Sequence, residues 1–259
     1  MMCSVINRKK KGQVTLFVII AIILVIIGVL IFLFYPKLKI TSKFNEENPN
    51  LYIQNCMEDY LKTTVNTIAV NGGYLNPIFY YLHQDEKFAY LCYTNKYVKM
   101  CSVQEPFLRE HFEFEIMNAT NAKAQECFSS LKAKYLQKGY NVDLIEGKIT
   151  AEILPEKILL KFPKYELTIS KEATKKYNSF MAILDNNLYL LLSIASNVVN
   201  WESNFGQSDV AYYSLVYPEL RTQRLNQDDG TTLYILENKK TGEKFQFASR
   251  SLAFPAGYY

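Results

Sequence analysis

Histidine is scarce in this chain, which contains only His83 and His111. The HExxH, GxSxG, P-loop and GxGxxG motifs are absent, so zinc hydrolases, serine hydrolases and nucleotide-binding enzymes have no support. His111 and Glu115 are one helical turn apart in REHFEFE and could share a metal ion. A solvated acidic helix face explains the same cluster more simply. The sequence therefore predicts a protein that is not an enzyme and that holds no metal or other cofactor.

An excess of positive charge is also missing once the N-terminus is set aside. The formal net charge is +4, and Arg8, Lys9, Lys10 and Lys11 account for all of it. Without these four, the 29 Lys and Arg fall to 25 and equal the 25 Asp and Glu. The rest of the chain thus has no global attraction for polyanions, and we expect no nucleic-acid partner.

Charge is entirely absent from residues 14–35, VTLFVIIAIILVIIGVLIFLFY. These 22 residues would span about 33 Å as a helix, which is the thickness of a bilayer core. A cleaved secretory signal would be shorter and would end in small residues, whereas this run ends in Phe-Leu-Phe-Tyr-Pro. We predict a cytoplasmic basic leader at residues 1–12, a transmembrane helix at 13–35, a linker at 36–50 and an extracellular domain beyond it.

Cysteine is sparse, and the predicted outer domain contains an even number of cysteines. Cys3 lies on the cytoplasmic side, and the four outer cysteines are Cys56, Cys92, Cys101 and Cys127. Zinc sites require CxxC-type spacing or nearby histidines, and neither is present, so disulfides are favoured. Of the three possible pairings, we predict Cys92–Cys101 across a hairpin and Cys56–Cys127 between two helices. The other two pairings would tie the ends of the hairpin to different helices and would stabilise the hairpin and the helix pair less.

Periodicity predicts an α+β fold in which amphipathic helices pack on an antiparallel β-sheet. Helical spacing covers residues 51–71, 107–137 and 171–203, and a hairpin turning at 94–96 lies within 78–103. Alternation over 140–170 predicts a meander of three or four strands with turns at 146–147, 155–156 and 163–164. TTLYILEN and EKFQFASR predict a final hairpin. We divide the outer domain into a disulfide-pinned helical part, 51–138, and a part with the sheet and a helix, 139–259.

The segment KKGQVTLF, residues 10–17, joins basic residues to a glycine, a glutamine and an unbroken apolar run. It resembles the class III signal peptide of archaeal type IV pilins and of membrane-anchored surface proteins of small-genome archaea. The resemblance implies cleavage between Gly12 and Gln13 by a prepilin-type peptidase, with the apolar helix retained and available for self-association. Pilins usually carry glutamate at the fifth mature position, where this chain has Phe17. An uncleaved signal anchor is the alternative.

We therefore expect a membrane-anchored structural or interaction protein of the cell surface, with pilin-like assembly as one form of that role. A tethered receptor or adhesin that never polymerises is the alternative, and an exported enzyme without a recognisable motif is the third. Asn118-Ala119-Thr120 is a sequon facing the side where glycosylation occurs, so Asn118 is a candidate glycosylation site.

Overall fold

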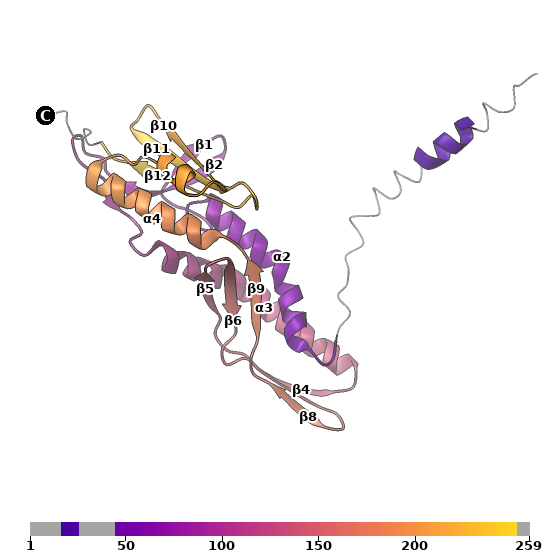
Figure 1. Cartoon of the computed structure of the whole chain (residues 1–259). Coiled ribbons are helices and arrows are strands. Elements are labelled where there is room, and N and C mark those ends of the chain that lie inside the picture. Colours follow the sequence, from indigo (N-terminus) through magenta and orange to yellow (C-terminus); the bar gives the residue numbers. More distant parts are fainter. Residues whose placement is uncertain (1–16, 26–44, 253–259) are drawn as a thin grey trace, which may run out of the picture. The chain divides into compact units, whose positions relative to one another are not determined.

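The computed structural model describes residues 17–25 and 45–252 (Figure 1). Residues 17–25 form a helix within the run predicted to be helical at 13–35. The predicted leader, the cleavage site at Gly12 and Gln13, and linker residues 36–44 lie outside the described residues. In these two described stretches, no helix combines the length and the apolar character needed to cross a membrane.

Two long helices form the centre of residues 45–252. Helix α2, Pro49–Val70, begins where the Asn48 side chain accepts a hydrogen bond from the Leu51 backbone N–H at 3.0 Å. Proline suits the first position because its missing N–H would have had no helical partner. Helix α3, Leu108–Gln137, ends just before Gly139, which has φ of +81°. Both helices were predicted within two residues at each end.

The largest sheet of the described region contains six strands, and α4 packs against it (Figure 1). Its order is β1-β2-β12-β11-β10, with β3 paired to β2. The predicted terminal hairpin is confirmed as β11 and β12. Strand β12 of this hairpin also pairs with β2, and these two strands run parallel. This pairing joins the two predicted parts of the outer domain into one compact unit. The strands are β1 (Tyr80–His83), β2 (Glu86–Tyr93), β3 (Ser102–Val103), β10 (Leu220–Asn226), β11 (Thr231–Asn238) and β12 (Lys244–Arg250).

The hairpin predicted within 78–103 is present as the antiparallel pair β2–β3, but residues 94–101 connect these strands as a longer loop instead of a tight turn at 94–96. A further hairpin, β1–β2, was not predicted, and it turns at Gln84 and Asp85, both of which have positive φ. Asp85 is a typical turn residue but Gln84 is not, so the sequence signal for this turn is weak. After β2 the chain forms a loop, which hydrogen-bonds to the C-terminal segment through Val98 N–H and the Leu252 carbonyl at 3.0 Å.

The strands predicted in 140–170 are present, but they do not form one meander. Two three-stranded sheets replace it, with orders β4-β7-β8 and β5-β6-β9. The predicted turns at 146–147 and 163–164 are crossings between these sheets, where a Cβ on Gly147 would lie 2.3 Å from the Pro163 carbonyl oxygen. Only glycine permits that approach. The strands are β4 (Asn141–Ile145), β5 (Thr150–Leu154), β6 (Lys157–Lys161), β7 (Glu166–Ser170), β8 (Thr174–Tyr177) and β9 (Met181–Asp185).

The helix predicted at 171–203 is wrong in its first half. Residues 174–185 contribute β8 and β9, and helix α4 covers only Leu188–Phe205. Lysine and alanine in 172–182 favour a helix locally, but Ala182 and Leu184 are buried at a spacing of two, which is the strand period. A short helix, α5, Ala211–Val216, follows α4. The α+β class with mostly antiparallel sheets is confirmed.

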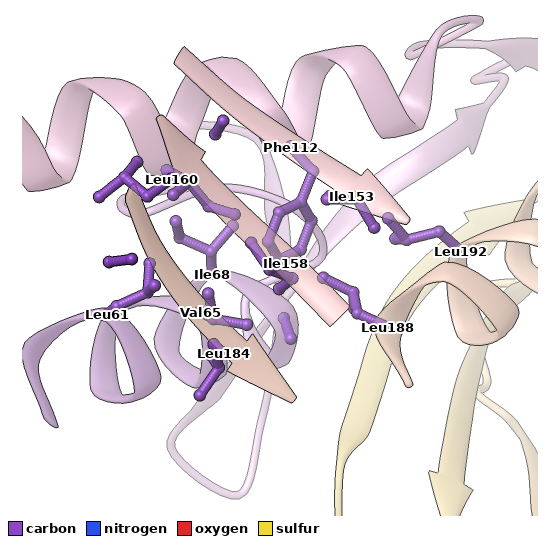
Figure 2. Packing of buried hydrophobic residues seen from close by; sticks show 14 of the residues in the cluster. Leu61, Val65, Ile68, Phe112, Ile153, Ile158, Leu160, Leu184, Leu188 and Leu192 are labelled. Carbon is purple, nitrogen blue, oxygen red and sulfur yellow. The ribbon is translucent and has the colours of Figure 1, made fainter. Parts of the chain in front are cut away.

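One hydrophobic core connects α2, α3, α4 and the sheet β5-β6-β9. Figure 2 shows Leu61, Val65 and Ile68 of α2 facing Ile158 and Leu160 of β6. Phe112 of α3 and Leu188 and Leu192 of α4 close the same cluster from the other sides. Burying such side chains contributes about 1.5–3 kcal/mol each, so the helix pair and this sheet stabilise one another.

Both predicted disulfides are confirmed. Cys56 of α2 is joined to Cys127 of α3, and Cys92 of β2 is joined to Cys101 just before β3. The first bridge encloses a sequence separation of 71 residues and the second a separation of 9. In the chain-entropy view, the longer loop constrains the unfolded state more.

We predict that removing each bridge lowers the free energy of unfolding by an amount set by its loop. The pair Cys56→Ala and Cys127→Ala should cost about 4 kcal/mol, and Cys92→Ala with Cys101→Ala about 2.5 kcal/mol. Urea unfolding of the full-length protein in detergent, followed by tryptophan emission, measures both. Cys3→Ala, made in the unprocessed chain, is the matched control and should change nothing. A larger loss from the Cys92–Cys101 pair would contradict the loop-length argument.

Candidate functional site

The exposed end of helix α4 carries two aromatic side chains. Its inward face is apolar at helical spacing, from Leu188 to Val199, so the opposite face points to solvent. Trp201 and Phe205 lie four residues apart on that outer face, and each is 52% exposed. Their ring centroids are 4.6 Å apart. Large aromatic rings exposed together are typical of binding surfaces rather than of inert surface.

A pocket opens between these rings and helix α5. Helix α4 ends at Gly206, which adopts the left-handed conformation with φ of +75° and turns the chain sharply. Residues 207–210 then lead into α5, which places Tyr212 and Tyr213 beside Trp201 and Phe205. The cavity has a volume of about 470 Å³, and the loop adds Gln207, Ser208 and Asp209 to its lining. Mostly aromatic walls with a few polar groups are the usual composition of a small-molecule site.

Glu202 positions the loop under this pocket. It points away from Trp201, is 2% exposed and accepts hydrogen bonds from the hydroxyls of Tyr234 and of Ser249, the latter at 3.1 Å. The same carboxylate accepts the Ser208 backbone N–H at 3.3 Å. A buried carboxylate is costly unless it is hydrogen-bonded, so these donors and the loop geometry depend on one another.

Burial raises the pKa of Glu202 above its usual value, although the hydrogen bonds from Tyr234 and Ser249 and the nearby charge of Arg224 act to lower it. Burial and the neighbouring carboxylate also raise the pKa of Tyr234. The network therefore favours a protonated carboxyl more than an exposed glutamate does.

Other contacts fix the far side of the loop. Val210 is buried, and its carbonyl accepts the Thr222 hydroxyl at 2.9 Å. Ser214 of α5 hydrogen-bonds the same Thr222 hydroxyl at 2.9 Å. Helix α5 and the loop before it are thus attached to β10. Glu202, at the other side of the loop, is attached to β11 and β12. A preformed pocket binds without a large ordering cost.

A second, wider cavity lies along α2 and β9, with a volume of about 1180 Å³. Asn50 accepts the Met181 N–H at 2.9 Å, and Gln54 both accepts the Ile183 N–H at 2.6 Å and donates to its carbonyl at 2.9 Å. Asn50 and Gln54 are four residues apart, which is a rise of about 6 Å along a helix, and Met181 and Ile183 are about 6.7 Å apart along a strand. The two spacings match, so each helix side chain reaches one residue at the edge of β9. Asn50 and Gln54 therefore have a structural role, because they cap the open edge of β9.

The acidic cluster around His111 does not converge on one point. Glu113 accepts the Ile153 N–H at 2.8 Å, and Glu115 accepts the Leu75 N–H at 2.9 Å. The His111 ring packs on Tyr74 at 4.4 Å between centroids, and its Nδ1 is 3.8 Å from a Glu105 oxygen. Within 17–25 and 45–252, no three His, Cys, Asp or Glu side chains are grouped to hold a metal ion. These carboxylates attach α3 to its neighbours.

Asn118 is exposed on α3, while Thr120 of its sequon is buried and donates its hydroxyl to the Ile116 carbonyl at 2.7 Å. Glycosylation at Asn118 stays a prediction. The aromatic pocket was missed in the sequence. Trp201 and Phe205 at positions i and i+4, followed by Gly206 and Tyr212-Tyr213, were the available signal.

We predict that Glu202→Gln changes how stability depends on pH. Because the folded pKa of Glu202 is raised above its usual 4.5, its contribution is fully present below pH 4.5 and is lost as pH rises through the raised pKa. Relative to the wild type, Glu202→Gln should therefore gain stability as pH rises. Urea unfolding between pH 4 and 8 measures this, with Glu126→Gln, at an exposed side chain of α3, as the control. A difference that does not vary with pH would refute the raised pKa.

Comparison of the chain with protein-family models, with curated proteins and with solved structures gives no match. No relative therefore assigns a role to the aromatic pocket or to the disulfide-bonded domain. The chemistry of the described residues, together with the composition of the N-terminal segment, is the basis for assigning a function.

Proposed function

We propose that this chain is a membrane-anchored interaction protein of the cell surface. The apolar run at 13–35 anchors it, the leader at 1–12 stays in the cytoplasm, and the domain from residue 45 onward faces outside. Its partners are the lipid bilayer and, transiently, a prepilin-type peptidase.

The observation that carries this proposal is the pair of disulfides. All four cysteines beyond residue 3 are used in two bridges, Cys56–Cys127 and Cys92–Cys101. Structural disulfides form and persist in oxidising compartments and are rare in the cytosol. An uncharged run of 22 residues lies upstream of this domain, after a basic leader. Export of the domain with retention of the helix accounts for both features.

The aromatic pocket supports an interaction role for the exported domain. It is preformed by the contacts of Glu202 and Thr222 and is open to solvent, as a recognition site requires. Self-association through 13–35 into a pilin-like filament is the second candidate. The Gly12-Gln13 junction favours it, whereas Phe17 at the usual glutamate position disfavours it. Filaments would be released by shearing cells, while a tethered monomer would stay in the membrane fraction.

We predict that the mature protein begins at Gln13. The small side chain of Gly12 lets the backbone enter a peptidase site at the boundary between the basic and apolar segments. N-terminal sequencing and intact mass of membrane-extracted protein check this. Gly12→Val should block processing, and Gly28→Val within the apolar run is the matched control that should leave it unchanged. Recovery of Met1 or Met2 on the wild-type protein would instead support an uncleaved signal anchor.

A further inference from the structure

We propose that the pocket lined by Trp201, Phe205, Tyr212 and Asp209 binds a neutral pyranose ring of a glycan. This inference rests on the proposed surface role for its biological setting, but the binding itself can be tested on the purified protein.

The rings offer the flat apolar surfaces on which a sugar packs. One face of a pyranose presents C–H groups that pack against an aromatic ring, while its hydroxyls point outward around the rim. Trp201 is 52% exposed and Tyr212 is 62% exposed, so ring surface of both is available to a ligand. The two residues come from different helices, α4 and α5, and line one cavity of about 470 Å³.

The loop between the helices supplies the hydrogen-bonding groups that sugar hydroxyls need. Gln207 offers an amide that both donates and accepts, and Asp209 offers carboxylate oxygens. One Asp209 oxygen accepts the Ala211 N–H at 2.9 Å, which fixes the side chain. The other Asp209 oxygen and the Gln207 amide have no hydrogen-bond partner within residues 45–252. Planar polar groups beside exposed rings are the combination that separates a sugar site from a purely apolar one.

The charge of the pocket excludes some classes of ligand. Asp209 is the one ionisable group other than the tyrosines among its lining residues, which include no Lys, Arg or His. Acidic sugars and anionic lipid headgroups would therefore be repelled. A quaternary ammonium ion would use the rings and the charge of Asp209 but not the Gln207 amide, so it is the competing ligand in the test. A neutral pyranose satisfies the rings, the amide and the carboxylate together.

The chain contains one tryptophan, and it lies in this pocket, so its emission reports on the site alone. The full-length protein in lipid nanodiscs is titrated with methyl glycosides of glucose, galactose, mannose and N-acetylglucosamine, and with their β- and α-linked disaccharides. At least one should give a saturable change in Trp201 emission with a Kd of about 1 mM or below. Glucuronic and sialic acid glycosides should bind at least tenfold more weakly.

Two variants test whether the change reports binding at these residues. Tyr212→Ala should weaken binding at least tenfold, and because its side chain is 62% exposed, truncation leaves the core intact. Asp209→Asn keeps the shape and should also weaken binding. Tyr97→Ala, at an 83% exposed tyrosine outside the pocket, is the matched control and should bind as the wild type does. Melting temperatures of all variants identify any loss of folding.

Three results would overturn the proposal. The first is the absence of a saturable change with every neutral glycoside while the protein is folded. The second is unchanged affinity in Tyr212→Ala. The third is quenching of Trp201 by brominated acyl chains in the nanodisc, or saturation by tetramethylammonium, because these would assign the rings to a bilayer surface or to an ammonium ligand. Failure of cleavage at Gly12 would refute the proposed processing without affecting these outcomes.

Discussion

The packing of α2 against α3 is the constraint on which the rest of the described domain depends. The Cys56–Cys127 bridge joins this helix pair covalently. Buried side chains of both helices, such as Leu61 and Phe112, belong to the core that also includes residues of β6 and α4. The sheet β5-β6-β9 packs on both helices, and β12 of the larger sheet contacts α2 and α4. A change that separated α2 from α3 would therefore expose the shared core rather than a local patch.

A buried carboxylate has a comparable role at the other end of α4. Glu202 accepts hydrogen bonds from β11, from β12 and from the loop after the helix, so one costly group connects four segments. Its neighbours on the helix, Trp201 and Phe205, point the opposite way and form the pocket wall. The same turn of helix thus holds the interior together and presents the rings outside. The base of the pocket is therefore continuous with the hydrophobic core, to which Val210 and Tyr234 belong.

The sequence predicted those elements whose signal is strong and local. Helices α2 and α3 have long apolar stripes with clear start and stop residues, and the two cysteine pairs follow from four cysteines that lie on or beside predicted helices and strands. The signal failed where tertiary context decides. Strand pairing across β4 to β9 depends on a hairpin inserted between β4 and β7, which alternation alone does not reveal. Strand β8, TKKY, is polar, and its register partner β7 is what makes it a strand.

The pocket was missed for a related reason. Aromatic residues at positions i and i+4 are more often core than surface, and only the burial of Leu191, Ala195 and Val198 shows that Trp201 faces outward. The buried role of Glu202 has no sequence signal, because the hydroxyls of Tyr234 and Ser249 reach it from strands 32 and 47 residues away. Groups assembled from distant segments become visible only once the sheet order is known.

The central claim is that the disulfide-bonded domain lies outside the cell, and lysine labelling on intact cells tests it most directly. Lys239 and Lys240 are exposed at the turn between β11 and β12. A membrane-impermeant amine reagent, followed by mass spectrometry of the peptide that contains them, should label both lysines without lysis. Labelling that appears only after lysis would place the domain inside and contradict the account.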